Sequence, residues 1–154
     1  MRFDEPQRKT LVKSLAMPQL DYCRLVHGGS ILSSKQNANT VQRALNEAMR
    51  TMSGFKMYQR TPTDTLQNIT GVASAAARVR KFLCGVGFHA VNAVNGSRYE
   101  FLGLRVARNS RLTVERTRLA STRRSPGIAV ATAWNGLSVG LRSMPNFFRL
   151  MDKL

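Results

Sequence analysis

Eight arginines lie within residues 98–124, and their type and density point more directly to a chemistry than any other residues of the chain. Only two acidic residues, Glu100 and Glu115, accompany them in this segment. Arginine carries a permanent charge on a planar guanidinium group, whose paired N–H donors match the spacing of phosphate oxygens. The segment therefore predicts contacts to a nucleic-acid backbone, and the alternative is a charged loop that is simply solvated.

Aromatic residues are sparse among these arginines, since Tyr99 and Phe101 are the only two. Binding of single strands relies on bases stacked upon aromatic side chains. The composition thus argues against base stacking and favours contacts to the backbone of a duplex.

Carboxylates and nucleophiles do not gather into a catalytic pattern. Of the eight Asp and Glu residues, only Asp4 and Glu5 are neighbours, whereas metal-dependent phosphoryl transfer needs clustered carboxylates. Cys23 and His27 have the i, i+4 spacing of contacting helix residues, but without a third member they are more typical of a core pair than of a catalytic dyad. We expect no enzyme activity, no metal site and no cofactor.

The overall charge supports a polyanionic partner. The 154 residues include 24 Lys and Arg against 8 Asp and Glu, which gives a net charge of +16. Nucleic acid is the first candidate partner and an anionic membrane surface the second; alternatively, the chain is part of a larger protein whose acidic portion lies elsewhere. No apolar run reaches the roughly 20 residues of a membrane span, and no targeting signal is evident, so we expect an intracellular protein, nuclear or cytoplasmic, without a membrane partner.

Helical periodicity dominates the first two thirds of the chain. Residues 7–27 predict a helix that Pro18 kinks or restarts and that Gly28-Gly29-Ser30 ends. The clearest helix is 39–53, where Leu45 belongs to an apolar stripe and Gly54 is the expected stop.

A third helix is expected over 72–88, and Pro145 opens a last one. Between them, the arginine-rich segment alternates weakly, which favours short strands or an extended loop over a helix. The predicted fold class is mainly α: a three-helix bundle over 1–96, then an Arg-rich segment, a Trp-Asn turn and a C-terminal helix over 97–154.

Four blocks of the sequence, taken in order, resemble the thumb and post-thumb region of non-LTR (LINE-type) retrotransposon reverse transcriptases. The first block is LVKSLAMPQLDYCRLV (11–26), and the second is VQRALNEAMRTMSG (41–54), where Gln42, Asn46, Ala48, Arg50 and Gly54 match the family's Q-x-x-x-N-x-A-x-R-x-x-x-G. ITGVASAAARVRKFL (69–83) is similar to the next helix. The stretch 122–154 is similar to the family's closing pattern, in which Trp134 and Asn135 match a Trp-Asn pair.

The resemblance implies a thumb-like helical unit that grips a template–primer duplex, and a structural role for Trp134, which would dock the C-terminal helix onto that unit. Asn135 would supply a turn. Nothing in the chain matches the family's palm motif, Tyr-x-Asp-Asp, and without these metal-binding carboxylates nucleotide transfer is not expected. A separate palm, or a larger ribonucleoprotein, is a further possible partner.

The expected function is thus non-catalytic binding to the backbone of RNA or an RNA–DNA duplex. The alternatives are a basic structural subunit of a large ribonucleoprotein and a transposon remnant without function. For Arg50, a structural role is an equal alternative to binding. The residues expected to contact nucleic acid are Arg43, Arg50, Arg78, Arg80, Lys81, Arg105, Arg108, Arg111, Arg116, Arg118, Arg123 and Arg124.

Overall fold

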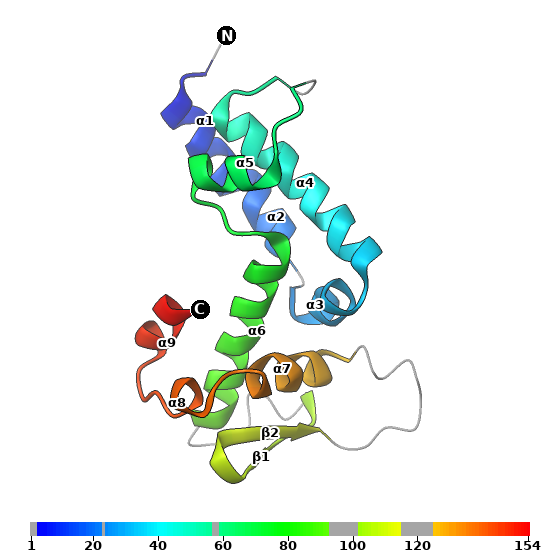
Figure 1. Cartoon of the computed structure of the whole chain (residues 1–154), viewed down its shortest axis with the longest axis vertical. Helices are drawn as coiled ribbons and strands as arrows, with labels where there is room; N and C mark the ends of the chain where they lie inside the picture. Colours follow the sequence, from blue (N-terminus) through cyan, green and yellow to red (C-terminus); the bar gives the residue numbers. More distant parts are fainter. Residues whose placement is uncertain (1–2, 23, 57–58, 93–101, 115–124) are drawn as a thin grey trace. The chain divides into compact units, whose positions relative to one another are not determined.

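The computed structural model describes residues 3–22, 24–56, 59–92, 102–114 and 125–154, and it confirms a mainly helical chain (Figure 1). In the described part, the strands form a two-stranded antiparallel sheet. The elements are α1 (Glu5–Leu11), the π-helical turn η1 (Val12–Ala16), α2 (Met17–Asp21), α3 (Arg24–Ser33), α4 (Lys35–Ser53), α5 (Thr63–Thr70), α6 (Ala75–Asn92), β1 (Leu104–Ala107), the turn η3 (Arg108–Ser110), β2 (Arg111–Val114), α7 (Pro126–Asn135), α8 (Val139–Arg142) and α9 (Phe147–Lys153).

The chain divides into two compact units. Unit 1 consists of residues 1–23 and 34–78, and unit 2 of residues 24–33 and 79–154. This division differs from the segments 1–96 and 97–154 that we expected from the sequence. The first turn of α6 belongs to unit 1 and the remainder to unit 2, because one long helix packs against different partners along its length.

Unit 1 is built around α4. Ser34 caps its first turn. Gly54 ends the helix with a left-handed φ of 73°, and this stop was predicted from the sequence. The helix begins four residues earlier than expected because Ser34 accepts the hydrogen bond of a capping residue, from the backbone N–H of Asn37. Its buried face carries Leu45, which is 2% exposed.

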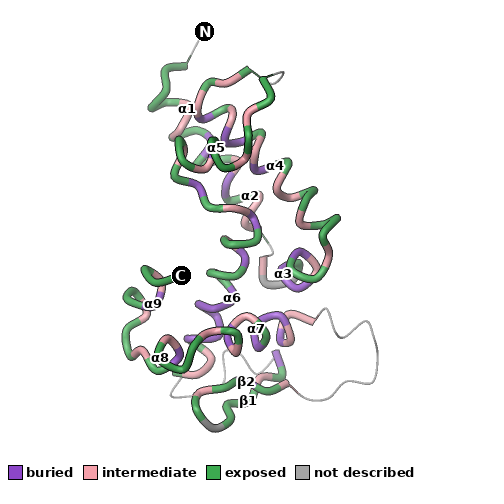
Figure 2. The backbone as a smooth tube through the Cα atoms, in the orientation of Figure 1, coloured by how far each residue is buried: buried purple, intermediate pink, exposed green. Residues whose placement is uncertain are grey.

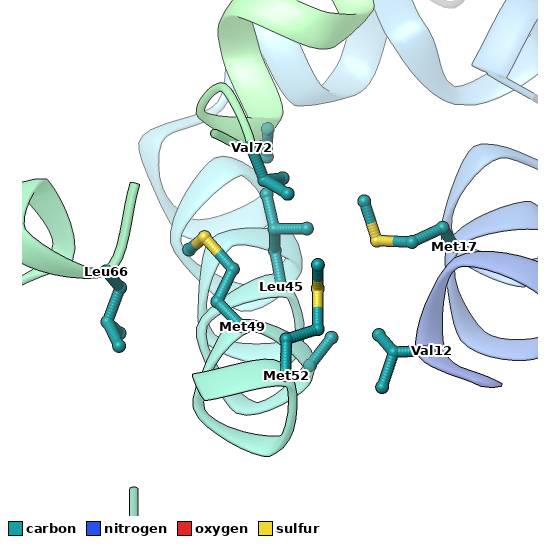
Figure 3. Packing of buried hydrophobic residues seen from close by; sticks show 9 residues of the cluster. Val12, Met17, Leu45, Met49, Met52, Leu66 and Val72 are labelled. Carbon is teal, nitrogen blue, oxygen red and sulfur yellow. The ribbon is translucent and has the colours of Figure 1, made fainter. Parts of the chain in front are cut away.

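The core of unit 1 forms between α4 and its neighbours (Figure 3). Met49 and Met52 of α4 are fully buried, and they pack in one cluster with Met17, Leu66 and other apolar side chains from the helices on either side. Methionine has an unbranched, flexible side chain that fills irregular gaps, which suits a junction of several short helices.

The expected end of the first helical segment at Gly28-Gly29-Ser30 is wrong. These residues lie inside α3, within unit 2. A side-chain carbon at Gly28 would lie 3.1 Å from Val79 and 3.3 Å from Leu83 of α6. The glycine therefore allows two helices to pack closely and does not end one of them.

The central element of unit 2 is α6. Residues 83–88 are buried on every side (Figure 2), because α3, α7 and α9 cover different faces of the helix. Gly85 faces Phe147 of α9, and Gly87 faces Trp134 of α7. Two glycines thus let two further helices approach the same helix from different directions.

Candidate nucleic-acid interface

The arginine-rich segment forms a β-hairpin in its described part. In the antiparallel register of β1 and β2, Arg105 is opposite Thr113 and Ala107 is opposite Arg111. Because side chains alternate across a strand, these four residues share one face of the hairpin, and all four are exposed. Arg105 and Arg111 are diagonal neighbours on that face, a relationship that places Cα atoms about 7–8 Å apart.

The opposite face of the hairpin packs on the protein through β2, whereas Val106 of β1 on the same face is 55% exposed. Leu112 on this face is 2% exposed, and β2 lies alongside α7 (Figure 1). One face therefore holds the hairpin in unit 2, and the other presents two guanidinium groups.

Trp134 anchors the turn of the hairpin. The indole is fully buried, and its Nε1–H donates a hydrogen bond to the backbone carbonyl of Ser110, with a distance of 2.6 Å between nitrogen and oxygen. Asn109 and Ser110 both have positive φ, 60° and 54°. L-residues rarely adopt this region, so the surrounding structure must hold them there.

Asn135 anchors the backbone of Leu112, two residues after Ser110. Its side-chain Oδ1 accepts a hydrogen bond from the Leu112 backbone N–H at 3.0 Å, and its Nδ2 donates one to the Leu112 carbonyl at 2.7 Å. Arg111 therefore lies between two anchored backbone positions, while its side chain points to the exposed face. This arrangement pre-organises the base of the Arg111 side chain and lowers the entropy that binding would cost.

The roles of Trp134 and Asn135 differ from those that the resemblance implied. Trp134 packs on Gly87 and Phe88 of α6 and bonds the hairpin, whereas the last helix α9 docks through Phe147, which packs on Phe88. Asn135 ends α7 and uses its side chain to bind Leu112, so its contribution extends beyond a turn.

Two arginines that the sequence assigned to nucleic acid are engaged inside unit 1. The Nη2 of Arg78 lies 2.5 Å from Asp21 Oδ2, in an ion pair whose side chains are 23% and 21% exposed. The Nη1 of Arg50 lies 2.5 Å from Oε1 of Glu47. Glu47 and Arg50 have the i, i+3 spacing of contacting helix residues, whereas no spacing indicates the pair of Arg78 with Asp21, which are 57 residues apart.

Of the other residues predicted to contact nucleic acid, some are exposed and some lie outside the described residues. Arg43 is exposed on α4 of unit 1, and Arg80 and Lys81 are exposed on α6, ahead of its buried stretch. Arg108 lies in η3, but its side chain is outside the description. Also outside the described residues are Arg116, Arg118, Arg123 and Arg124.

Sequence reasoning missed a polar network that organises unit 1. Gln42 donates through Nε2 to Asn46 Oδ1 at 2.8 Å, and its Oε1 accepts the backbone N–H of Ala75 at 2.8 Å. Asn46 donates in turn to the Thr63 hydroxyl at 2.9 Å. These bonds join α4 to the starts of α5 and α6, so the Gln-Asn spacing in the second block has a structural explanation.

The positive charge is concentrated in unit 2. Its residues include 14 Lys and Arg against three Asp and Glu, a net charge of +11, which leaves +5 for unit 1. A surface with this imbalance attracts polyanions over distances comparable to the Debye length, about 8 Å at physiological salt. The hairpin thus belongs to the more basic unit.

Cys84 is buried on α6, and its Sγ lies 3.5 Å from the carbonyl of Ala133. Burial raises the pKa of the Cys84 thiol to about 11. A thiol with this pKa is almost entirely protonated at neutral pH and is a poor nucleophile.

Among the residues with a described structure, no three His, Cys, Asp or Glu side chains come together as a metal site would require. Likewise, no helix in the described ranges combines the length and apolar character needed to cross a bilayer. No protein-family model matches the sequence, and no curated protein or solved structure does.

Proposed function

We propose that this protein binds the sugar–phosphate backbone of RNA or an RNA–DNA duplex without catalysing a reaction, and that the exposed face of the β1–β2 hairpin makes the contact. The observation that carries the proposal is the double anchoring of this hairpin by Trp134 and Asn135. A buried indole and a bidentate amide hold the backbone on both sides of Arg111.

Three features support this assignment. Arg105 and Arg111 share one exposed face, the hairpin belongs to the unit with a net charge of +11, and the sequence blocks resemble a polymerase thumb, which grips duplexes by their backbone. Guanidinium groups bind phosphate oxygens through paired N–H donors. Backbone contacts of this kind position a protein on a duplex without reading its sequence.

Salt-dependent binding tests the proposal. Wild-type protein is titrated with an RNA–DNA hybrid, a DNA duplex and a single-stranded RNA of equal length, each over a series of salt concentrations. The logarithm of the binding constant should fall linearly with the logarithm of the salt concentration. For a duplex, the slope should be about −0.9 per neutralised phosphate. We expect the steepest slope and the tightest binding with the hybrid.

A matched pair of double variants locates the interface. Arg105→Gln with Arg111→Gln should reduce the salt slope by about 1 to 2, because each lost arginine neutralises one phosphate fewer. Lys13→Gln with Lys35→Gln removes the same charge from exposed positions of unit 1 and should leave most of the slope intact. Equal losses in the two variants would refute the assignment to the hairpin, and binding that disappears by physiological salt for all three ligands would refute the function.

A further inference from the structure

Arg142 is the last residue of α8, in unit 2, and it is the one charged side chain that is buried in the described part of the chain. Its exposed fraction is 4%. Within the residues that the structure describes, its Nε and Nη1 atoms are buried and have no hydrogen-bond partner. Two buried donors of a permanently charged group are therefore left unsatisfied.

Among the described residues, the other arginines with a buried unpartnered nitrogen do not share this situation. Arg8 and Arg50 also leave a buried Nε without a partner, but Nη1 of Arg8 donates to the Phe3 carbonyl and Nη1 of Arg50 bonds Glu47. A guanidinium stays protonated in a protein and keeps its charge. An unpaired buried ion is strongly destabilising, so the position of Arg142 calls for an anion.

Unit 2 holds few carboxylates that could serve as this anion. They are Glu100, Glu115 and Asp152; Asp152 is exposed on α9, and the two glutamates lie outside the described residues. Arg142, in contrast, shares its unit with 13 other Lys and Arg residues, so anions from solution gather around it.

We propose that Arg142 forms the base of a binding site for a phosphate oxyanion. The proposal rests on the proposed function where the phosphate comes from nucleic acid, but the same chemistry would hold inorganic phosphate. The third nitrogen, Nη2, is not one of the buried unpartnered atoms. It shares one bidentate edge of the guanidinium with Nε and the other with Nη1, so an oxyanion held at Nη2 is placed to pair with either buried donor once that donor is uncovered.

The first experiment compares thermal unfolding in sodium phosphate and in sodium chloride at equal ionic strength. Phosphate should raise the Tm of wild type by about 5 °C when it is well above its dissociation constant, because it binds the folded state. Arg142→Met should lose this response and, in chloride, should melt no lower than wild type, since it removes an unpaired buried charge. Arg149→Gln, an exposed arginine of α9, should respond like wild type.

A response of Arg142→Met to phosphate equal to that of wild type would overturn the proposal, as would the absence of any response in wild type. If Arg142→Met does not fold, titration calorimetry of wild type with inorganic phosphate replaces the comparison. In that titration, heat of one-site binding that Arg142→Lys weakens about tenfold supports the site, and no heat overturns it.

The second experiment separates the two sources of phosphate. If the occupant is a backbone phosphate, Arg142→Met should bind the RNA–DNA hybrid about tenfold more weakly than wild type, and inorganic phosphate should compete with the hybrid. If the occupant is free phosphate, hybrid affinity should stay unchanged while the Tm response is still lost. If the hairpin plays no part in hybrid binding, the rise in Tm that phosphate causes should still be seen. Failure of the proposed function is therefore distinguishable from failure of this site.

Discussion

The side chain of Asn135 replaces a neighbouring strand for one residue of the hairpin, because it bonds both the N–H and the C=O of Leu112, at 3.0 and 2.7 Å. Leu112 is itself buried. A single amide thereby satisfies two backbone groups that would otherwise have no partner on that edge of β2.

Replacement of this amide should loosen the hairpin. Asn135→Ala removes both hydrogen bonds, at about 1 kcal/mol each, and should destabilise the protein by about 2 kcal/mol. Hydrogen exchange should show the Leu112 amide losing protection. Asn68→Ala is the control, since Asn68 is exposed on α5 of unit 1 and should change the free energy of unfolding by less than about 0.5 kcal/mol. An unchanged exchange rate at Leu112 in Asn135→Ala would contradict the anchoring role.

The close approach of α6 and α7 depends on the absence of a side chain at Gly87. An added Cβ would lie 2.9 Å from the Cβ of Trp134 and 3.0 Å from its ring, and the Trp is fully buried. Gly87→Ala should therefore destabilise the protein by about 1–3 kcal/mol through overpacking, despite the better helix propensity of Ala. Urea unfolding measures the difference.

Gly140 provides the matched control for Gly87. It lies in α8, and nothing lies within 4 Å of an added Cβ. Gly140→Ala should therefore be neutral or stabilise the protein by up to about 1 kcal/mol. If both substitutions have the same effect, the proposed packing between α6 and α7 is wrong.

The indole N–H of Trp134 should matter separately from its bulk. Trp134→Phe keeps most of the apolar ring but removes the donor to the Ser110 carbonyl, so the free energy of unfolding should fall by about 1–3 kcal/mol. The salt slope for hybrid binding should fall as well, because Ser110 and Asn109 are then less strongly held at positive φ. A destabilised variant with an unchanged slope would show that the turn geometry is irrelevant to binding.

The ion pair between Arg78 and Asp21 should contribute to stability and not to binding. Arg78→Gln leaves the partly buried Asp21 without this partner, and we expect a loss of about 1–3 kcal/mol with hybrid affinity nearly unchanged. Glu5→Gln breaks the more exposed pair with Lys9 and should leave the free energy of unfolding almost unchanged, because water screens an exposed ion pair. A large loss of hybrid affinity in Arg78→Gln at full stability would return this arginine to the interface.

The buried thiol of Cys84 should react slowly in the native protein. With Cys23→Ser as background, a disulfide reagent at pH 8 should modify Cys84 at the rate of unfolding, because the side chain is fully buried and burial also raises the pKa of its thiol from 9.0 to about 11. The unfolded thiol ionises at the lower pH, so the contribution of Cys84 to stability should decline as pH rises from about 9 to 11. Cys84→Ala removes that decline, and fast native modification at pH 8 would contradict the burial.

The sequence was informative wherever a local pattern determined the structure. The helix α4 follows from an apolar stripe that includes Leu45, and from Gly54 as its stop. In contrast, α7 was not predicted, because the helix is buried at Ala129, Val130 and Ala131 in succession. A helix that is apolar on most of its surface has no amphipathic period to detect.

The sequence by itself determined the mainly helical class and a positive charge far in excess of the negative, since both depend on composition and short-range periodicity. It could not distinguish Arg78, which pairs with a carboxylate 57 residues away, from Arg105 and Arg111, which share an exposed face. Nor could it place Trp134 and Asn135 against a hairpin that precedes them by more than 20 residues. Only the tertiary structure decided these pairings, because a hydrogen bond or ion pair depends on distance in space and leaves no periodic signal along the chain.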